Sequence, residues 1–422
     1  MLYTSKKYLL LLSCILQLAL VSNSAVAADE YVSIQEYLNQ LAEQQKPPQI
    51  YGELVKQSKA SSFYFAGEPY QGKSSRIFAI YNTPKNTKPP FPAVVLVHGG
   101  GGTAFKQWVQ KWNDAGFAAI AIAVEGQTDI VNENSTGRAN KWQHHKWSGP
   151  ARNKIYADSK QPMLDQWMFH ASSAVIRAHN LLRSFDEIDD TKIGLSGISW
   201  GGVISSTVLG FDQRFAFAVP IYGSGALSGM ENQYGKALKN NAVYQTFWEP
   251  NLRLGNYQGP TLWLTGLKEK HFSLDGQAET YKTVSGLHQV SILENLKHGH
   301  GAAWRTNEPY AFARTVVNQS QFPVRFSEQV INNQQVKIIL NRVGKLEELS
   351  ELTSASLWLT KDSGHTGKRQ WQKLPVKVTA NVIDHEQKTT FSASLPEQTI
   401  SWFFNVEIDG LTYSSDFSTV SH

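Results

Sequence analysis

A serine between two glycines, at the junction of a strand and a helix, limits the possible folds of this chain more than any other feature. Residues 193–195 form an apolar run typical of a buried strand, and residues 203–209 resemble the start of a helix. Between them, residues 197–201 read Gly-Ile-Ser-Trp-Gly. In such a GxSxG turn the glycines let the two backbones approach closely, and the serine hydroxyl is raised above the sheet. The alternative interpretation is an ordinary glycine-rich turn.

Similar apolar runs recur before and after this turn. They lie at residues 93–97, 118–124, 193–195, 215–221, 262–264 and 290–293. Continuous apolar strands are typical of a parallel sheet that is covered on both faces. From Trp167 to Leu182, apolar residues recur at offsets of three and four, as on one face of a long helix. The chain is therefore predicted to be α/β, with a doubly wound, mostly parallel sheet in residues 28–320, of which 28–75 form a polar lead-in.

The pattern changes after residue 321. Alternating strands separated by polar turns are expected at residues 336–340, 356–359, 376–382, 390–395 and 402–408. Because no long helix intervenes, residues 321–422 are predicted to form a C-terminal all-β sandwich domain. This domain could bind carbohydrate or only cap the rest of the chain. Its candidates for exposed aromatic side chains, Trp358, Trp371 and Trp402, do not decide between the two.

The first 27 residues have the features of a cleavable secretory signal. Two lysines precede an apolar run over residues 8–21, which is shorter than the roughly 20 residues that a membrane span needs. The sequence Ala-Val-Ala ends at Ala27, so cleavage is expected there. We predict a secreted or periplasmic protein that is not attached to the membrane after cleavage. Cys14, the single cysteine, would be lost with the signal, which excludes disulfides, thiol catalysis and cysteine-ligated metals.

The composition narrows the classes of partner. With 41% hydrophobic and 18% charged residues, the chain has enough apolar material for packed cores. Removal of Lys6 and Lys7 with the signal lowers the formal net charge from +5 to +3. So small a positive charge does not indicate a nucleic-acid or membrane-surface binder. The sequence gives no indication of the oligomeric state.

A second glycine-rich loop follows the strand at residues 93–97. It reads His-Gly-Gly-Gly-Gly over residues 98–102. Backbone N–H groups in such a loop can bind a developing oxyanion, together with the N–H of the residue after the nucleophile. The predicted oxyanion donors are Gly100, Gly101, Gly102 and Trp200. A nucleotide loop is the alternative, but no Lys-Ser/Thr pair follows and the spacing is not GxGxxG. His98 is interpreted as structural.

A carboxylate and a histidine follow the last two predicted parallel strands, which is where a Ser, acid, His order requires them. Glu269 comes three residues after Gly266 and is preferred as the acid, with Asp275 as the alternative. His298 comes five residues after the last strand and is preferred as the base, with His300 as the alternative. In this hypothesis His298 takes the proton of Ser199, and the acid holds the imidazole in the required tautomer. The order of these residues predicts a serine hydrolase.

Three segments carry a family resemblance: KIGLSGISWGG, AVVLVHGGGG and RFAFAVPIYG. They resemble the α/β-hydrolase superfamily, in its dienelactone hydrolase and acetyl xylan esterase-like branch of secreted bacterial esterases. The resemblance spans roughly Arg76 to Ala302 and implies ester hydrolysis without a cofactor, with an acetylated plant or algal polysaccharide or oligosaccharide as substrate. Relatives commonly have a Gly-Thr-Asn-Asp turn where this chain has Gly-Leu-Lys-Glu at residues 266–269.

The long polar segment between Val124 and Pro162 is a candidate lid or substrate wall, since structureless loops of this length are uncommon. We predict that tryptophans stack on sugar rings and that basic groups meet uronic acids or other anionic glycans. The candidate substrate-binding residues are Trp142, His145, Trp147 and Arg152. The alternative is a solvated basic loop whose tryptophans cover the core. No metal site is predicted, because adjacent histidines point differently and no carboxylate lies at ligand spacing.

Two other functions fit parts of the pattern. A serine peptidase of the prolyl oligopeptidase type uses the same triad, but it needs a subsite for a peptide terminus and often carries a large N-terminal propeller. A noncatalytic glycan-binding protein would have the same fold but would not hydrolyse a substrate. The complete set of expected catalytic residues favours the esterase.

Overall fold

The computed structural model describes residues 29–52, 61–135, 137, 141–319, 325–327, 329–332, 334–343, 352–383 and 386–420. The predicted signal, residues 1–27, lies outside these residues. Within the described part of the chain, no helix is both long and apolar enough to cross a bilayer.

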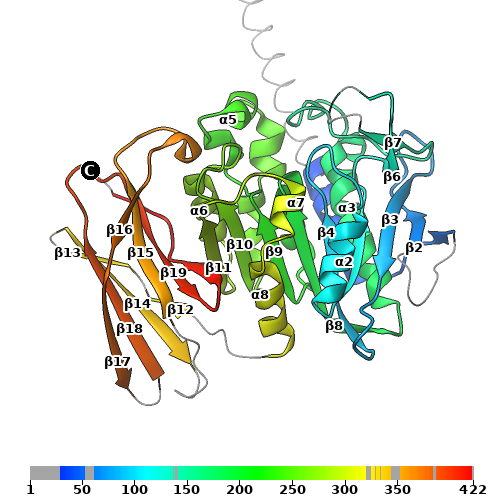
Figure 1. The fold of residues 1–422 in the computed structure, drawn as a ribbon. Coiled ribbons are helices and arrows are strands. Elements are labelled where there is room, and N and C mark those ends of the chain that lie inside the picture. Colours follow the sequence, from blue (N-terminus) through cyan, green and yellow to red (C-terminus); the bar gives the residue numbers. More distant parts are fainter. Residues whose placement is uncertain are drawn as a thin grey trace, which may run out of the picture.

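A large mixed sheet forms the centre of the molecule (Figure 1). Its middle is parallel, in the order β5-β4-β8-β9-β10-β11, and the antiparallel strands β3, β2 and β1 extend one edge. The bounds are β1 Ile50–Tyr51, β2 Ser61–Ala66, β3 Arg76–Asn82, β4 Phe91–Val97, β5 Ala118–Ile122, β8 Ile188–Ile198, β9 Phe217–Ile221, β10 Thr261–Gly266 and β11 His288–Leu293. The predicted α/β class is confirmed. The lead-in differs from its expectation, because it supplies two edge strands after a helix over residues 29–43.

Helices cover both faces of this sheet (Figure 1). The bounds are α2 Lys106–Asp114, α3 Trp167–Arg183, α4 Trp200–Leu209, α5 Gln233–Leu238, α6 Leu274–Tyr281, α7 His300–Ala303 and α8 Glu308–Val317. On one face, the Trp112 indole of α2 packs edge-on against Tyr310 of α8, with 4.9 Å between ring centroids. On the other face, α3 and α4 pack against each other and against β8. This arrangement is the doubly wound topology that the continuous apolar strands predict.

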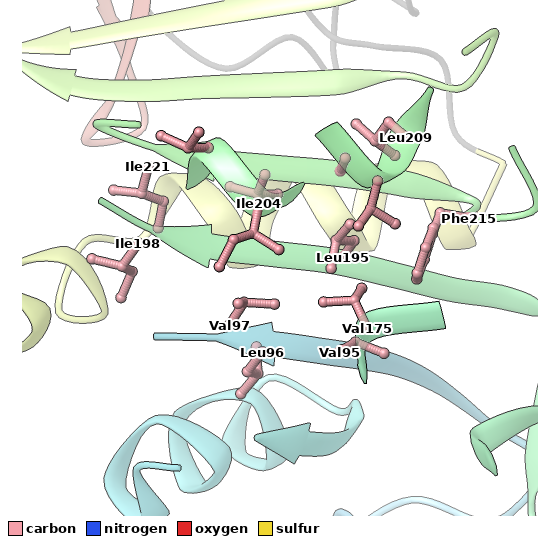
Figure 2. Close-up of a cluster of buried hydrophobic side chains, with 14 of the residues drawn as sticks. Val95, Leu96, Val97, Val175, Leu195, Ile198, Ile204, Leu209, Phe215 and Ile221 are labelled. Atoms are coloured by element: carbon pink, nitrogen blue, oxygen red, sulfur yellow. The ribbon is translucent and has the colours of Figure 1, made fainter. Parts of the chain in front are cut away.

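The core lies between β4, β8 and α4. Val95 and Leu195 are fully buried on neighbouring strands, and Ile204 of α4 lies over β8 (Figure 2). Because both faces of the parallel strands are covered, residues 93–97 of β4 and 118–122 of β5 are all apolar. The tight core fixes the carboxyl ends of the strands, from which the candidate catalytic loops start.

The C-terminal strands form two antiparallel sheets that pack as a sandwich. One contains β20, β19, β15 and β16 with β21 beside β19, and the other contains β12, β14, β18 and β17 with β13 beside β14. The bounds are β12 Arg325–Phe326, β13 Val330–Asn332, β14 Gln335–Val343, β15 Leu352–Thr360, β16 Gln372–Pro375, β17 Lys377–Ile383, β18 Glu386–Ser394, β19 Ser401–Ile408, β20 Leu411–Ser414 and β21 Ser418–Thr419. Ile338, Phe391 and Phe404 lie in their shared core. The predicted β-sandwich is confirmed.

The sandwich is joined to the central sheet, which the sequence does not predict. β20 pairs with β11 through Val290 and Ser414, so one sandwich sheet continues the parallel sheet. The other face of that sheet also packs on the core around the central sheet through Trp358 and Phe403. Trp358 and Trp402 are therefore buried, and Trp371 is half-buried against Phe403. The expectation that these tryptophans are exposed is wrong, because they pack on the two faces of the sheet.

Candidate active site

Ser199 occupies a strained turn between β8 and α4. Its φ of 58° and ψ of −118° lie outside the ordinary regions for a residue with a side chain. The turn is held because the Ser199 N–H donates to the carbonyl of Ile221 at 2.8 Å, and the Ser199 carbonyl accepts from the N–H of Gly202 at 2.8 Å. The side chain thus projects at the carboxyl end of the sheet, as the GxSxG pattern predicts.

The flanking glycines are required by close backbone approach. A Cβ atom added to Gly197 would overlap the carbonyl of Gly201, and one added to Gly201 would overlap the carbonyl of Val97 at the end of β4. No side chain fits at either position without moving a strand or the helix. The GxSxG spacing therefore has a steric cause in this structure.

His298 and Glu269 complete a hydrogen-bonded chain with Ser199. The His298 Nε2 atom lies 3.0 Å from Ser199 Oγ, and its Nδ1 atom lies 2.7 Å from Glu269 Oε2. Since a carboxylate can only accept, Nδ1–H donates to Glu269, and Nε2 is the atom that can accept the serine proton. The loops after β8, β10 and β11 bring these three residues together from positions far apart in the sequence.

The Glu269 carboxylate is buried and well supplied with donors. Its Oε1 atom accepts from the N–H of His271 at 2.7 Å, and only 2% of the residue surface is exposed. Burial alone would raise the pKa of Glu269, but the hydrogen bond and charge of His298 and the His271 N–H together hold this pKa below its ordinary value. Glu269 is therefore an anion at neutral pH, as the orientation of His298 requires.

The structure places the two alternative residues elsewhere. Asp275 lies in the first turn of α6, where its carboxylate accepts from the N–H of Gly276 at 2.9 Å and lies 3.7 Å from Arg369. His300 lines the same pocket as Ser199, but its Nε2 accepts from the N–H of Gly99 at 2.9 Å. His298, the preferred base, contacts Ser199, and Glu269, the preferred acid, contacts His298.

The glycine loop packs directly against the serine turn. The loop is tied internally, because Gly102 N–H donates to the Gly99 carbonyl at 3.0 Å. No hydrogen bond among the described residues uses the N–H groups of Gly100 or Gly101. Trp200 begins α4, so its N–H has no acceptor one turn earlier in the helix. Gly100, Gly101 and Trp200 thus offer donors, whereas the predicted donor Gly102 is already engaged inside the loop.

His98 has a structural position, as expected. It is buried, its Nε2 accepts from the N–H of Val124 at 3.0 Å, and its Nδ1 lies 2.7 Å from the Gly99 carbonyl oxygen. Burial lowers its pKa, so the ring stays neutral and joins the glycine loop to the start of the next loop.

Ser199 opens into a pocket of about 830 Å³. Trp142 and Arg152 from the long polar segment line it, which supports a role for that segment as a wall. The Trp142 indole N–H donates to the Gly101 carbonyl at 3.2 Å, and Trp142 packs edge-on against Phe105. The segment contains a short hairpin, β6 Gln127–Val131 and β7 Trp142–His144, and is not a structureless loop.

His145 and Trp147 do not line this pocket. Both pack on the Tyr64 ring of β2, with centroid distances of 5.0 Å and 5.6 Å. Burial and the charges of His144 and Arg76 lower the pKa of His145 to about 4. The structure therefore does not support the predicted substrate contacts of these two residues, which instead cover the sheet edge.

Several pocket residues were not predicted from the sequence. They are Gln107 of α2, Tyr234 of α5, His271, and Trp304 and Arg305 just after α7. Trp304 and Arg305 follow His298 closely in the chain, and this proximity could have indicated them. Tyr234 carries no comparable local signal, because only the tertiary fold brings α5 to the site.

The β-rich C-terminal region supports the loop that carries Glu269. A short 3₁₀ turn, η7 Thr366–Lys368, lies against this loop. Thr366 Oγ1 accepts from the N–H of Leu274 at 2.6 Å, and Lys268 Nζ donates to the Arg369 carbonyl at 3.0 Å. A Cβ added to Gly367 would overlap the carbonyl of Glu269. The C-terminal region thus fixes the position of the candidate acid.

This contact predicts that Gly367→Ala lowers kcat for a reaction that uses Ser199, His298 and Glu269 by on the order of 10²-fold, because a shift of about 1 Å in a catalytic group can have such an effect. Steady-state kinetics would measure it, with KM expected to change little. Gly229→Ala is the matched control, since a Cβ there meets nothing within 4 Å. A Gly367→Ala protein that folds and keeps the wild-type kcat would contradict this role.

The described residues contain no group of three or more His, Cys, Asp or Glu side chains that could hold a metal ion.

One family model matches part of the chain. Residues 34–226 match the sequence model of the acetyl xylan esterase (AXE1) family. No curated protein matches the chain at a significant level.

Among solved structures, an acetyl xylan esterase from Paenibacillus sp. R4 is similar with a TM-score of 0.51 and 17% identity, over 67% of this chain and 93% of that one. Acetyl xylan esterase 1 from Thermoanaerobacterium sp. JW/SL YS485 has a TM-score of 0.47 and 14% identity, and the match covers 69% of this chain and 93% of that one. The acylaminoacyl peptidase of Pyrococcus horikoshii has a TM-score of 0.46 and 17% identity, and the match covers 63% of this chain and 43% of the peptidase. The parallel sheet and its covering helices have the α/β-hydrolase fold, and residues 34–226 are similar in sequence to acetyl xylan esterases.

Proposed function

We propose that this protein is a secreted serine carboxylesterase that removes acetyl groups from a polysaccharide or oligosaccharide. The observation that carries the proposal is the unbroken hydrogen-bonded chain from Ser199 Oγ through His298 to the buried Glu269 carboxylate. The match to the acetyl xylan esterase family supports ester substrates. The signal-like leader supports a location in the periplasm or outside the cell, where such polymers are met.

The first half of the reaction forms an acyl-enzyme. Ser199 Oγ attacks the ester carbonyl carbon while His298 Nε2 takes the hydroxyl proton. The negative charge that develops on the carbonyl oxygen is stabilised by N–H groups of the glycine loop and of Trp200. His298 then returns the proton to the departing sugar oxygen, and the acetyl group stays on Ser199.

The second half releases acetate. A water molecule gives its proton to His298 Nε2 and attacks the acetyl carbon, and the same N–H groups hold the second oxyanion. Collapse of this intermediate returns the proton from His298 to Ser199 Oγ. Throughout both halves Glu269 keeps Nδ1 protonated and stabilises the imidazolium, so no cofactor is needed.

The side chains beside Ser199 favour a small acyl group. Trp200 is buried, and its ring lies 5.8 Å from Tyr156, 5.7 Å from Trp167 and 5.6 Å from Tyr234, measured between centroids. This aromatic cluster restricts the space next to the nucleophile. Trp142 and Trp304 on the pocket wall offer flat faces suited to sugar rings.

The pocket chemistry argues against a peptidase of the prolyl oligopeptidase type. A peptide amino terminus is usually bound by a carboxylate, and none of the described residues that line the pocket is Asp or Glu. A noncatalytic glycan-binding role is also disfavoured, because it would not require an aligned serine, histidine and glutamate.

A panel of three substrates tests the proposal: p-nitrophenyl acetate, acetylated xylan and a proline-containing peptide amide. We expect acetate release from the first two and no cleavage of the peptide. Cleavage of the peptide alone would favour the peptidase, and inactivity on all three would favour a binding protein.

A further inference from the structure

We propose that the pocket is built for a glycan that carries an oxyanion substituent, a carboxylate or a sulfate, near the acetyl ester. Arg152 is the group that binds this substituent most closely, and Lys141 and Arg305 attract it at the pocket mouth. The inference rests on the proposed esterase function and specifies the substrate class of the same site.

Basic side chains outnumber acidic ones among the described residues that line the pocket. Lys141, Arg152 and Arg305 line it, and no described lining residue is acidic. Two carboxylates that contact lining residues are each engaged in an ion pair, since Glu125 lies 2.9 Å from Arg152 and Glu269 lies 2.7 Å from His298. Neither Lys141 nor Arg305 forms a salt bridge with any residue that the structure describes. The mouth of the pocket therefore has a positive excess.

The guanidinium of Arg152 is held in place before any ligand binds. Its Nε donates to Glu125 at 2.9 Å, and its Nη1 donates to the Lys154 carbonyl at 2.6 Å. Its Cζ atom lies 4.9 Å from the centroid of the Trp200 ring. Glu125 is itself fixed, because it accepts from Gln127 at 2.8 Å. A group held this firmly loses little conformational entropy when it binds an anion.

The remaining nitrogen of Arg152 points to the reaction centre. Nη2 has no hydrogen-bond partner among the described residues, and it lies 2.6 Å from where a Cβ of Gly100 would be. Gly100 belongs to the candidate oxyanion loop, and its neighbour Gly99 packs against Ser199. An anion on Nη2 would therefore sit on the same sugar as the acetyl ester, or on the adjacent one.

The hydrogen-bonding capacity of the pocket also favours an anion. A sugar hydroxyl both donates and accepts, so a pocket for a neutral glycan benefits from acceptor side chains. Here Gln107 is the only side-chain amide among the described lining residues, while Lys141, Arg152 and Arg305 can only donate. Carboxylate and sulfate oxygens can only accept, and guanidinium groups bind both with matching geometry.

Changing the substrate tests this inference without altering the protein. Acetylated xylo-oligosaccharides that carry glucuronic acid are compared with the same compounds after reduction of the carboxyl group to the neutral alcohol. We expect kcat/KM to be about 10- to 100-fold higher for the acidic form, the range expected for hydrogen bonds to a charged group. The difference should shrink as salt is added.

A sulfated, acetylated oligosaccharide forms the third arm and distinguishes the two anions. Preference for either charged form over its neutral counterpart supports the inference, and the preferred form identifies the anion. Equal kcat/KM for charged and neutral forms would overturn it. Hydrolysis of p-nitrophenyl acetate reports separately on the esterase, so failure of the charge preference and failure of the proposed function are distinguishable.

Substitutions assign the preference to residues. Arg152→Gln is expected to lower the preference for the acidic over the neutral substrate by roughly 10- to 100-fold. Lys141→Gln and Arg305→Gln are each expected to lower it by about 2- to 5-fold, because exposed charges interact weakly. The last two side chains are exposed, so their replacement does not endanger folding. Lys146→Gln is the matched control, since Lys146 lies over Trp147 and outside the pocket. An unchanged preference in all three pocket variants would contradict the assignment.

Discussion

Ser199→Ala is expected to lower kcat for ester hydrolysis by about 10⁴- to 10⁶-fold, the range seen when a catalytic serine is removed from a triad. The reason is the position of Ser199 Oγ, 3.0 Å from His298 Nε2 and beside the unused N–H groups of the glycine loop. Without the hydroxyl, His298 has no nucleophile to activate. Release of p-nitrophenol from the acetate ester and of acetate from acetylated xylan would measure the loss.

A second serine, close to Ser199 in the chain, provides the control. Ser205 lies in α4, and its buried hydroxyl has no hydrogen-bond partner among the described residues. Ser205→Ala should therefore retain the wild-type kcat and stability within a small factor. Residual activity of Ser199→Ala close to that of Ser205→Ala would show that another group is the nucleophile.

Glu269→Gln should have the next largest effect, a fall in kcat of about 10⁴-fold, as expected when the acid of a triad is replaced by its amide. A glutamine at this position can turn its NH₂ group toward His298 Nδ1. His298 would then carry its proton on Nε2, which could no longer accept from Ser199. Since the amide is close in shape to the carboxylate, the loop and its contacts with residues 366–369 should be retained.

Asp275→Asn is the matched control for this experiment. Asp275 is the other carboxylate of the same loop region, but it lies in α6 and contacts Gly276 and Arg369 instead of His298. We expect Asp275→Asn to change kcat by less than about 10-fold, as for a surface group away from the chemistry. A large loss in Asp275→Asn with normal activity in Glu269→Gln would reverse the assignment of the acid.

Much of the fold could be predicted from local patterns. The runs at residues 93–97 and 193–195 are apolar without interruption because helices cover both faces of β4 and β8. The union of the sandwich with the central sheet could not be predicted in this way. It depends on the pairing of Val290 with Ser414, two residues far apart in the chain whose contact leaves no local signal.

The site likewise has features that local sequence patterns predict and features that depend on tertiary contacts. The positions of Ser199, Glu269 and His298 follow from strand ends, since the carboxyl ends of parallel strands meet at one edge of the sheet. Which residues of the long polar segment face the pocket depends on tertiary packing. Trp142 is turned inward by its hydrogen bond to Gly101, whereas Trp147 is turned outward onto Tyr64.

The central claim is that Ser199 carries the acetyl group during turnover. Rapid mixing with p-nitrophenyl acetate, acid quenching and mass spectrometry of the digested protein would test it most directly. We predict an added acetyl group on the peptide that contains Ser199, absent from the Ser199→Ala protein. Rapid acetate release with no acetyl group on Ser199, or with the acetyl group on another residue, would contradict the account.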